Sequence, residues 1–392
     1  MKEICFILPI GLPVPNVKGG AIETLITNLI NENEKNKKMK FTIISLYNNE
    51  AYKLSTLYSM SSFIYIKKDL RYYLKSLKVR IHNFFNKEKY NTYNEYILDK
   101  IKDKKFDLII VEDGNYFSFK HYTKYFDKNK LVLHMHHDGI SNLELGNIYS
   151  KFIGISNYVT NKFKRNSNIK QYYTLMNGID LNKFKNKITS VEKETLRKQI
   201  GFKKDDFIVL FCGRIIQEKG VIELAQAVSE INNDKVKLLI VGSVNFSENK
   251  TSEYEQKLKK IIIQNDKIKI TGYIKNDELY RYYQVADIQV VPSVCEEAAG
   301  LVAIEGMISG LPLIITNSGG MVEYVSKDTI VVEKKNDIVN SLKNEICKLH
   351  KDINKREKMK KFGIETANKF GTESFYNDFY KMVLNMVGDG NE

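Results

Sequence analysis

The chain has 392 residues, of which 43% are hydrophobic and 28% charged, so it is long enough for two globular domains. This composition excludes a disordered or collagen-like protein. The formal net charge is +14, and the whole excess lies in the first half: residues 1–190 hold 31 Lys and Arg against 17 Asp and Glu, whereas residues 191–392 hold 30 of each. The two halves are therefore expected to meet different partners. Nucleic acid is not expected among them, because no recognition motif accompanies the basic charge.

The cysteines and the N-terminus indicate where the protein works. The four cysteines form no CxxC pair, which favours a reduced, intracellular protein. The opening MKEICFILPI is interrupted by Glu3 and proline, so it is interpreted as a buried strand and not as a signal peptide. No run of 18 apolar residues occurs. The protein is expected in the cytoplasm or peripherally on the inner face of the cytoplasmic membrane.

Short apolar runs alternate with amphipathic stretches along the chain, which is typical of βαβ units with parallel sheets. The expected strands are Ile4–Pro9, Phe41–Leu46, Leu108–Val111, Leu131–His134, Phe152–Ile155, Ile208–Cys212, Lys237–Val241, Ile268–Thr271, Ile288–Val291, Leu313–Thr316 and Ile330–Val332. The polar stretch Lys183–Lys198 is the best linker candidate. An α/β fold of two doubly wound, Rossmann-like domains follows, with residues 1–188 and 189–371 as the domains. In open α/β sheets, ligands bind beyond the carboxyl ends of strands, so motifs placed there carry most weight.

A glycine turn with two cations follows the strand at 208–212. Gly213-Arg214 and Lys219-Gly220 stand before a helix that begins near Val221. The glycines allow a tight turn, and Arg214 and Lys219 could together neutralise a diphosphate. A solvated turn with surface charges explains this stretch equally well.

Two glutamates follow the strand at 288–291. Gly300 precedes an apolar helical run, whose N–H groups and dipole can face an anion. Glu297 lies in the loop before this helix and Glu305 lies inside it. A carboxylate among apolar residues is costly unless it is paired, and carboxylates accept hydrogen bonds from sugar hydroxyls. Alternatively, both glutamates face solvent near the start of the helix.

The spacing Glu297–x7–Glu305 decides between these interpretations, because it resembles the E-x7-E motif of GT-B glycosyltransferases of family GT4. Neighbouring segments follow the order and spacing of that family, most densely over residues 170–330. They are Val291-Pro-Ser, Gly310-Leu-Pro, Ser318-Gly-Gly-Met-Val-Glu323, Gly213-Arg214 with Lys219-Gly220, Gly242, Gly272-Tyr273 and Met176-Asn-Gly-Ile-Asp180.

The resemblance implies a GT-B fold, with two Rossmann-like domains facing a central cleft and a terminal helix, residues 372–388, packed back on the first domain. It implies retaining sugar transfer from a nucleotide-diphosphate sugar. For the second half it implies that Arg214, Lys219 and the N–H groups of Gly300 and Leu301 hold the donor diphosphate. It also implies that Glu305 binds the ribose, and that Glu297 contacts the donor sugar and assists at the reacting centre. No cofactor and no metal are expected, and no Asp-x-Asp occurs in the chain. Ala299 departs from the family, which often carries an aromatic residue there.

The first half offers a glycine loop and a histidine segment. Gly19-Gly20 precedes a helix and resembles the family's loop at the donor, so Gly20 is expected at the diphosphate, and Lys18 is either a further contact or a solvated lysine. His134, His136 and His137 follow or end a strand. Because alternate residues of a strand share a face, His134 and His136 lie together and His137 points the other way.

These histidines admit two interpretations. A zinc site is disfavoured, because no further ligand cluster is evident in the sequence. The resemblance implies instead that a histidine at this strand end contacts the donor sugar or the acceptor, and His136 fits best, with His134 second. Glu112, which with Asp113 follows another strand, is expected either to line the acceptor side or to lie in an exposed loop.

The segment Lys67–Lys89 predicts an amphipathic helix with eight basic and two acidic residues. One interpretation packs its apolar stripe on the core. The other places it on an anionic membrane surface, which would explain why only this half is basic.

The sequence therefore predicts a retaining hexosyltransferase with a nucleotide-sugar donor, UDP favoured, and a saccharide acceptor, lipid-linked, in envelope or capsular polysaccharide synthesis. The alternatives are a GT-B epimerase acting on UDP-sugars and a catalytically silent GT-B partner subunit.

Overall fold

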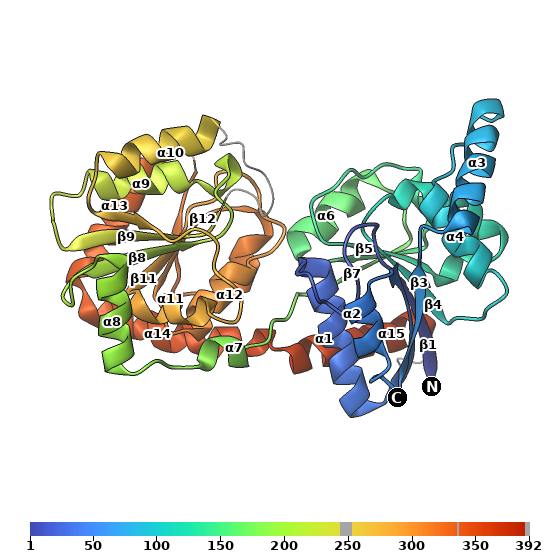
Figure 1. Cartoon of the computed structure of the whole chain (residues 1–392), viewed down its shortest axis with the longest axis horizontal. Coiled ribbons are helices and arrows are strands. Elements are labelled where there is room, and N and C mark those ends of the chain that lie inside the picture. The colour runs from blue at the N-terminus through green and yellow to red at the C-terminus, as the bar shows by residue number, and fades with distance from the viewer. Residues whose placement is uncertain (244–252, 335–336, 389–392) are drawn as a thin grey trace. The chain divides into compact units, whose positions relative to one another are not determined.

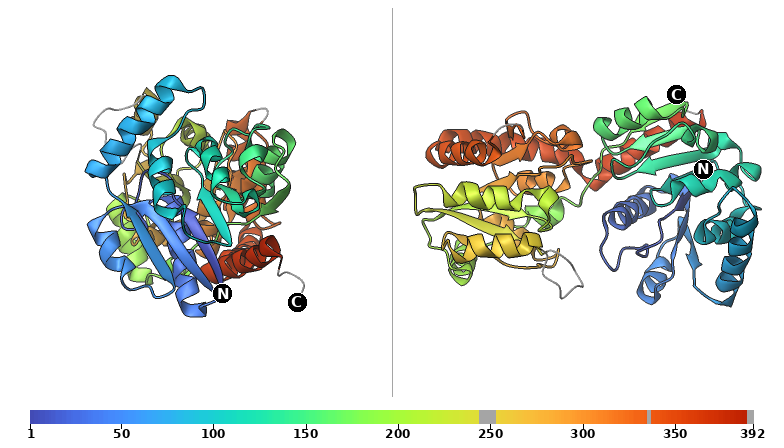
Figure 2. Two further views of the ribbon diagram at one scale, coloured as in Figure 1. Left: turned by 90° about the vertical axis from the view of Figure 1, so that its right-hand side faces the viewer. Right: turned by 90° about the horizontal axis from the view of Figure 1, so that it is seen from above.

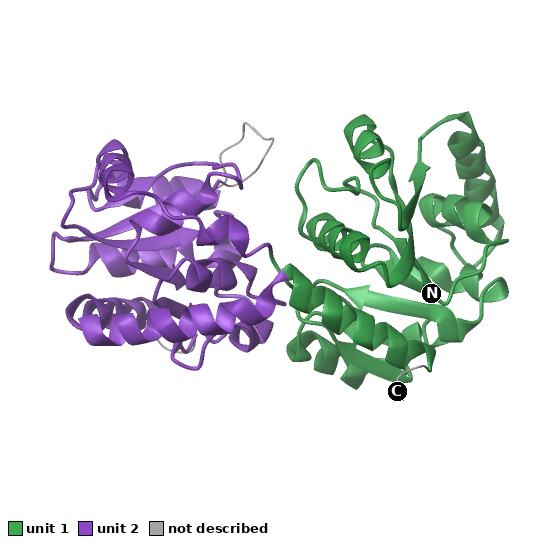
Figure 3. Cartoon of the chain, turned by 90° about the horizontal axis from the view of Figure 1, so that it is seen from below, with its two compact units in different colours: residues 1–179, 372–392 green, residues 180–371 purple. Residues whose placement is uncertain are grey.

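The computed structural model describes residues 1–243, 253–334 and 337–388. The chain forms two compact units, residues 1–179 with 372–392 and residues 180–371 (Figure 3). The boundary lies at Ile179–Asp180, ahead of the expected position after residue 188. The expected linker Lys183–Lys198 is wrong, because most of it is helical: α7 (Asn182–Lys185) and α8 (Ser190–Ile200) lie there. A capping box between Thr189 and Glu192 starts α8, and this local signal outweighs its polar composition.

The first unit is built on a parallel sheet of seven strands in the order β3-β2-β1-β4-β5-β6-β7 (Figure 1). Its strands are β1 (Lys2–Ile7), β2 (Met39–Leu46), β3 (Ser61–Ile66), β4 (Leu108–Glu112), β5 (Leu131–Met135), β6 (Lys151–Gly154) and β7 (Gln171–Thr174). Its helices are α1 (Ala21–Asn36), α2 (Asn49–Ser55), α3 (Leu70–Phe85), α4 (Thr92–Ile101), α5 (Leu145–Ile148), α6 (Asn157–Asn166) and α15 (Thr372–Val387), with 3₁₀ turns at Tyr116–Lys124 and Lys128–Lys130. The two edge strands, β3 and β7, were not among the expected strands.

The second unit is built on a parallel sheet of six strands in the order β10-β9-β8-β11-β12-β13 (Figure 1). Its strands are β8 (Phe207–Cys212), β9 (Val236–Val241), β10 (Ile268–Ile270), β11 (Ile288–Val291), β12 (Leu313–Thr316) and β13 (Ile330–Val332). Besides α7 and α8 its helices are α9 (Val221–Ser229), α10 (Glu253–Ile263), α11 (Leu279–Val285), α12 (Leu301–Ile308), α13 (Ile338–Lys351) and α14 (Ile353–Ala367), with 3₁₀ turns at Gln217–Lys219, Gly319–Tyr324 and Asn368–Phe370. All six expected strands of this half are present.

Each sheet is covered by helices and buries apolar side chains on its faces (Figure 2). In the first unit this core includes the terminal helix α15, which lies beside α1. Phe379 packs against Phe6 and Phe41, and the Tyr376 hydroxyl donates to Asn33 Oδ1 over 2.8 Å. The C-terminal helix α15 therefore completes the core of the first unit, which the N-terminal residues otherwise form. The parallel order places the carboxyl ends of the strands at one edge of each sheet, where the candidate residues lie.

Candidate functional site

The second unit brings Lys219 and Glu297 into contact. Lys219 ends the 3₁₀ turn after β8, and its Nζ lies 2.6 Å from Glu297 Oε1. The Ser293 hydroxyl donates to the same oxygen over 2.5 Å. The two loops are joined through their backbones, since Val294 N–H donates to the Glu218 carbonyl over 3.0 Å. Two loops that follow different strands therefore bring a cation and a carboxylate into contact.

Gly220 makes this approach of the two loops possible. Its φ of 66° is left-handed, and a Cβ there would lie 1.9 Å from the carbonyl oxygen of Pro292. Any side chain at residue 220 would therefore push the loop of Lys219 away from the loop of Glu297. In the resulting pair the Lys219 side chain is 25% exposed and the Glu297 side chain 19% exposed.

Arg214 and the start of α12 lie at the same edge of this sheet. Arg214 is exposed beyond the end of β8. Gly300 is the N-cap of α12, Leu301 is its first residue, and no side chain caps it. A helix N-terminus without a side-chain cap leaves backbone N–H groups for an anion. The diphosphate roles of these residues stay predictions.

Glu305 lies inside α12 and is partly buried. The hydroxyl of Tyr283, on α11, donates to Glu305 Oε2 over 2.7 Å. Burial raises the pKa of Glu305 to about 7, although the Tyr283 hydrogen bond opposes this shift. Tyr283 and Ser293 are partners of these glutamates that the sequence does not predict. Ser293 belongs to the Val291-Pro-Ser segment and could have been found there, whereas no local pattern points to Tyr283.

The glycine loop of the first unit ends at α1. Gly20 is the N-cap of this helix with a φ of 101°, and a Cβ there would meet the Glu23 carboxylate. Lys18 is exposed. Burial raises the pKa of Glu23, which is 6% exposed. The expected contact between Gly20 and a diphosphate stays a prediction.

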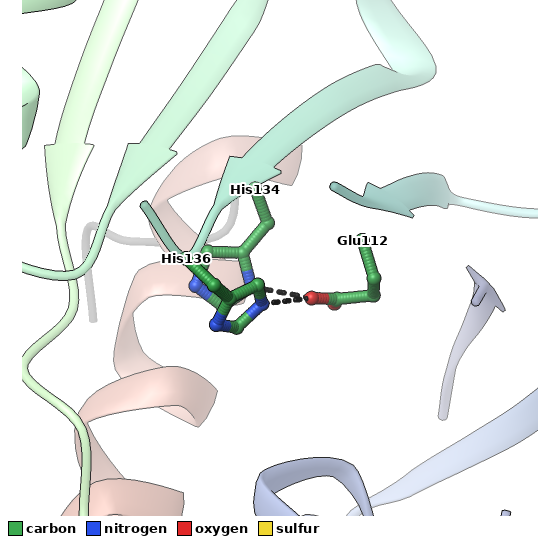
Figure 4. Close-up of side chains that lie close together, drawn as sticks. All are labelled: Glu112, His134 and His136. Atoms are coloured by element: carbon green, nitrogen blue, oxygen red, sulfur yellow. Dashed lines mark hydrogen bonds and ion pairs between the residues drawn. The ribbon is translucent and has the colours of Figure 1, made fainter. Parts of the chain in front are cut away.

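The carboxyl ends of β4 and β5 hold Glu112, His134 and His136 together (Figure 4). Glu112 Oε2 lies 2.6 Å from His136 Nε2 and 2.9 Å from His134 Nδ1. His137 points the other way, as expected, and its Nε2 lies 2.8 Å from Asp113 Oδ1. The alternative of an exposed Glu112-Asp113 loop is wrong, since the two residues are 0% and 7% exposed.

The charges in this group depend on one another. Burial opposes a charge on Glu112, but the two imidazoles outweigh burial and hold the pKa of this carboxyl below its usual value. Burial lowers the pKa of His136, and the neighbouring His134 adds to this effect. The geometry fits a neutral His136 imidazole whose Nε2–H donates to Glu112.

The helix predicted over Lys67–Lys89 is α3, and its apolar stripe faces outward. Tyr72 and Val79 are its buried residues, and Tyr72 packs against Tyr96 of α4. The seven side chains of the predicted apolar stripe are all at least half exposed: Leu70, Tyr73, Leu74, Leu77, Ile81, Phe84 and Phe85. The interpretation that packed this stripe on the core is therefore wrong. Figures 1 and 2 show α3 at the outer edge of its unit.

Residues 192–366 match the family model described as Glycosyl transferases group 1. Residues 192–366 therefore form a group 1 glycosyltransferase domain. Lys219, Glu297, Gly300 and Glu305 all lie within this domain. The resemblance drawn from the E-x7-E spacing is thereby confirmed at the level of the family.

Two relatives and one solved structure show similarity that extends beyond this domain. Lipopolysaccharide 1,2-N-acetylglucosaminetransferase of Salmonella typhimurium is 28% identical over 237 residues, which are 58% of this chain and 59% of that protein. The putative glycosyltransferase YtcC of Bacillus subtilis is 26% identical over 347 residues, 83% of this chain and 77% of that protein. The match thus spans less than two thirds of the Salmonella enzyme.

The solved structure is Anabaena HepE in complex with UDP and glucose, with a TM-score of 0.71 and 16% identity over 98% of this chain and 100% of that one. At this identity the likeness shows the fold alone, and it confirms the predicted GT-B fold of two Rossmann-like units.

Proposed function

We propose that the chain is a retaining glycosyltransferase that moves a hexose-type sugar from a UDP-sugar to a lipid-linked saccharide in envelope or capsular polysaccharide synthesis. The observation that carries the proposal is the Lys219–Glu297 pair beside the uncapped start of α12, inside the group 1 domain. The UDP complex of HepE and the lipopolysaccharide acceptor in the name of the Salmonella relative support the choice of donor and acceptor class.

In the proposed reaction Lys219 and Arg214 neutralise charge that develops on the diphosphate as the sugar leaves. The N–H groups at the start of α12 add fixed dipoles with the same sign. Lys219 is held 2.6 Å from the Glu297 carboxylate, so a phosphate that binds this ammonium would displace Glu297 from it. Glu297 would then be free to contact the sugar. Glu305 would accept hydrogen bonds from the ribose hydroxyls.

This arrangement supplies the positive charge for the diphosphate from side chains and backbone. We therefore propose that the donor diphosphate needs no divalent metal. In the first unit, His136 would contact the sugar or the acceptor, with His134 and Glu112 behind it. The acceptor hydroxyl would attack from the face that the diphosphate leaves, which retains the anomeric configuration.

The transfer reaction is tested with a panel of UDP-sugars and lipid-linked saccharides extracted from bacterial envelopes. The expected result is UDP release that requires the acceptor, with a product whose NMR spectrum shows the anomeric configuration of the donor. Inversion of the configuration would contradict the retaining mechanism. Conversion of the UDP-sugar to an isomer without any acceptor would favour the epimerase, and UDP binding without any turnover would favour the silent partner subunit.

The proposal includes contact of α3 with an anionic membrane surface. Its apolar side chains are flanked by exposed basic residues that include Lys78, Arg80 and Lys87. Burying one large apolar side chain contributes about 1.5–3 kcal/mol, and a basic residue near an anionic surface contributes about 1 kcal/mol. No helix of the described residues has the length and apolar character to cross a bilayer.

Replacing Leu77 and Phe84 together by glutamate is expected to abolish co-sedimentation with phosphatidylglycerol vesicles. The two side chains are 56% and 81% exposed, so the melting temperature should stay unchanged. Leu57→Glu is the matched control, because Leu57 is 76% exposed in the same unit but lies outside α3. Equal vesicle binding by the double variant and the control would contradict the membrane contact.

A further inference from the structure

The group Glu112, His134 and His136 is assembled by the register of the first sheet. In the parallel pair of β4 and β5, Glu112 is the register partner of His134. Partners in adjacent strands share a face, and His136, two residues further on, points to the same side. Three side chains of types that commonly bind metal ions therefore converge at one point from two neighbouring strand ends (Figure 4).

Hydrogen bonds satisfy this group only in part. Glu112 Oε1, His136 Nδ1 and both ring nitrogens of His134 are buried atoms without a hydrogen-bond partner. His134 Nδ1 lies 2.9 Å from Glu112 Oε2, yet the contact lacks the alignment of a hydrogen bond. Glu112 is 0% and His134 1% exposed, so water does not readily supply the missing partners. Buried polar atoms are rarely left unpaired, and such a group requires an explanation.

The charge of the group points in the same direction. The ion pairs that the described residues make with Glu112 come from His134 and His136, and neither lysine nor arginine takes part. A fully buried carboxylate that no lysine or arginine contacts is costly unless a cation lies beside it. A cation among the three side chains would remove that cost. It would also give His134 Nδ1 and Glu112 Oε2 a common partner.

We infer that Glu112, His134 and His136 form a binding site for a divalent transition-metal ion, with zinc the best match. Two imidazoles and one carboxylate, with a fourth position left open, are a donor set that zinc takes in proteins. Nitrogen donors disfavour magnesium and calcium, which prefer oxygen ligands. The three ligand atoms lie within 4.8 Å of one another. A four-coordinate ion with bonds of about 2.1 Å would require the two close contacts to open by less than about 1 Å.

All three ligands of the inferred site belong to the first unit, and none of them is among the residues proposed to hold the diphosphate. The site would draw on the same imidazole, that of His136, that the proposed sugar contact uses. Metal binding and the proposed function are nevertheless tested independently, since the readout below is metal content and requires no sugar donor.

The experiment uses the untagged full-length protein, stripped with a chelator and titrated with zinc chloride by calorimetry. The expected result is one zinc ion per chain, retained after gel filtration. Glu112→Gln and His136→Gln are each expected to weaken zinc binding at least about tenfold. His137→Gln is the matched control, because His137 lies in the same segment but pairs with Asp113 outside the group. It should bind zinc like the wild type.

Cobalt binding gives a second readout that needs no variant. The wild-type protein with one equivalent of cobalt(II) is expected to show the intense visible absorption of a four-coordinate ion. Absence of stoichiometric zinc binding by the wild type would overturn the inference and leave a buried carboxylate–imidazole group. Zinc binding by folded Glu112→Gln and His136→Gln equal to that of the wild type would also overturn it, since the ion would then lie elsewhere.

Discussion

Lys219→Ala is expected to lower sugar transfer about 10²–10³-fold, the usual cost of removing one group that stabilises charge in a transition state. The ammonium of Lys219 is held 2.6 Å from the Glu297 carboxylate. Among the described residues, no other lysine or arginine forms an ion pair with Glu297 that could replace it. UDP affinity should fall as well, since the same cation binds the diphosphate before transfer. Calorimetry with UDP and initial rates with a UDP-sugar measure the two effects.

Lys334→Ala is the control for this variant. Lys334 pairs with Glu296, the residue next to Glu297. The substitution therefore removes a lysine–glutamate pair of the same kind from the same loop. It should transfer sugar at the wild-type rate. Both variants should fold, because Glu297 keeps its hydrogen bond from Ser293 when Lys219 is absent. Wild-type transfer and UDP affinity in folded Lys219→Ala would show that this lysine does not hold the diphosphate.

Glu305 is expected to make both stability and UDP affinity depend on pH. Burial raises its pKa from 4.5 to about 7 in the folded protein. The folded state then holds a proton that the unfolded state has lost, so stability falls as pH rises from 4.5 to 7. The shift corresponds to a loss on the order of 3 kcal/mol above pH 7. Glu305→Gln carries no such penalty. In urea unfolding, its free energy of unfolding should therefore rise relative to that of the wild type between pH 5 and pH 8.

The ligand dependence has the opposite sign. Ribose hydroxyls donate hydrogen bonds, which the ionised carboxylate accepts best, so UDP should bind the wild type more tightly as pH rises through about 7. Glu305→Gln should bind UDP weakly and without this dependence. Glu323→Gln is the control, because it removes one carboxylate from the same domain, and it should keep the wild-type pH profile of UDP affinity. Gln284→Glu is not suitable as a control, because it adds a charge. A wild-type affinity that is flat from pH 6 to pH 8 would contradict the role of Glu305.

The elements that can be predicted from the sequence are those whose burial produces a regular pattern of apolar residues. Central strands such as Ile288–Val291 are buried on both faces and appear as apolar runs, so the sequence locates them. The edge strands β3 and β7 keep partly exposed side chains, which blurs that signal. The polar composition of Lys183–Lys198 predicts a linker, but the capping box of Thr189 and Glu192 within it starts α8.

The candidate site divides in the same way. Motif spacing places Glu297 and Glu305 on one loop and one helix, but it does not show that Ser293 and Tyr283 bind them, because these contacts depend on tertiary packing. The alternation of a strand predicts that His134 and His136 share a face. That Glu112 meets them depends on the register between β4 and β5, which no local pattern in either strand specifies.

The measurement that tests the central claim most directly is thermal unfolding of the full chain with UDP, GDP, dTDP and ADP, each with and without EDTA. The shift caused by each nucleotide is compared within one EDTA condition, so that removal of any other metal does not enter it. The account predicts that UDP raises the melting temperature by the same amount in both conditions, and that the rise is lost in Lys219→Ala. Stabilisation by UDP only when EDTA is absent would contradict a donor site built from side chains and backbone. No shift with any nucleotide up to saturating concentrations would contradict the donor site itself.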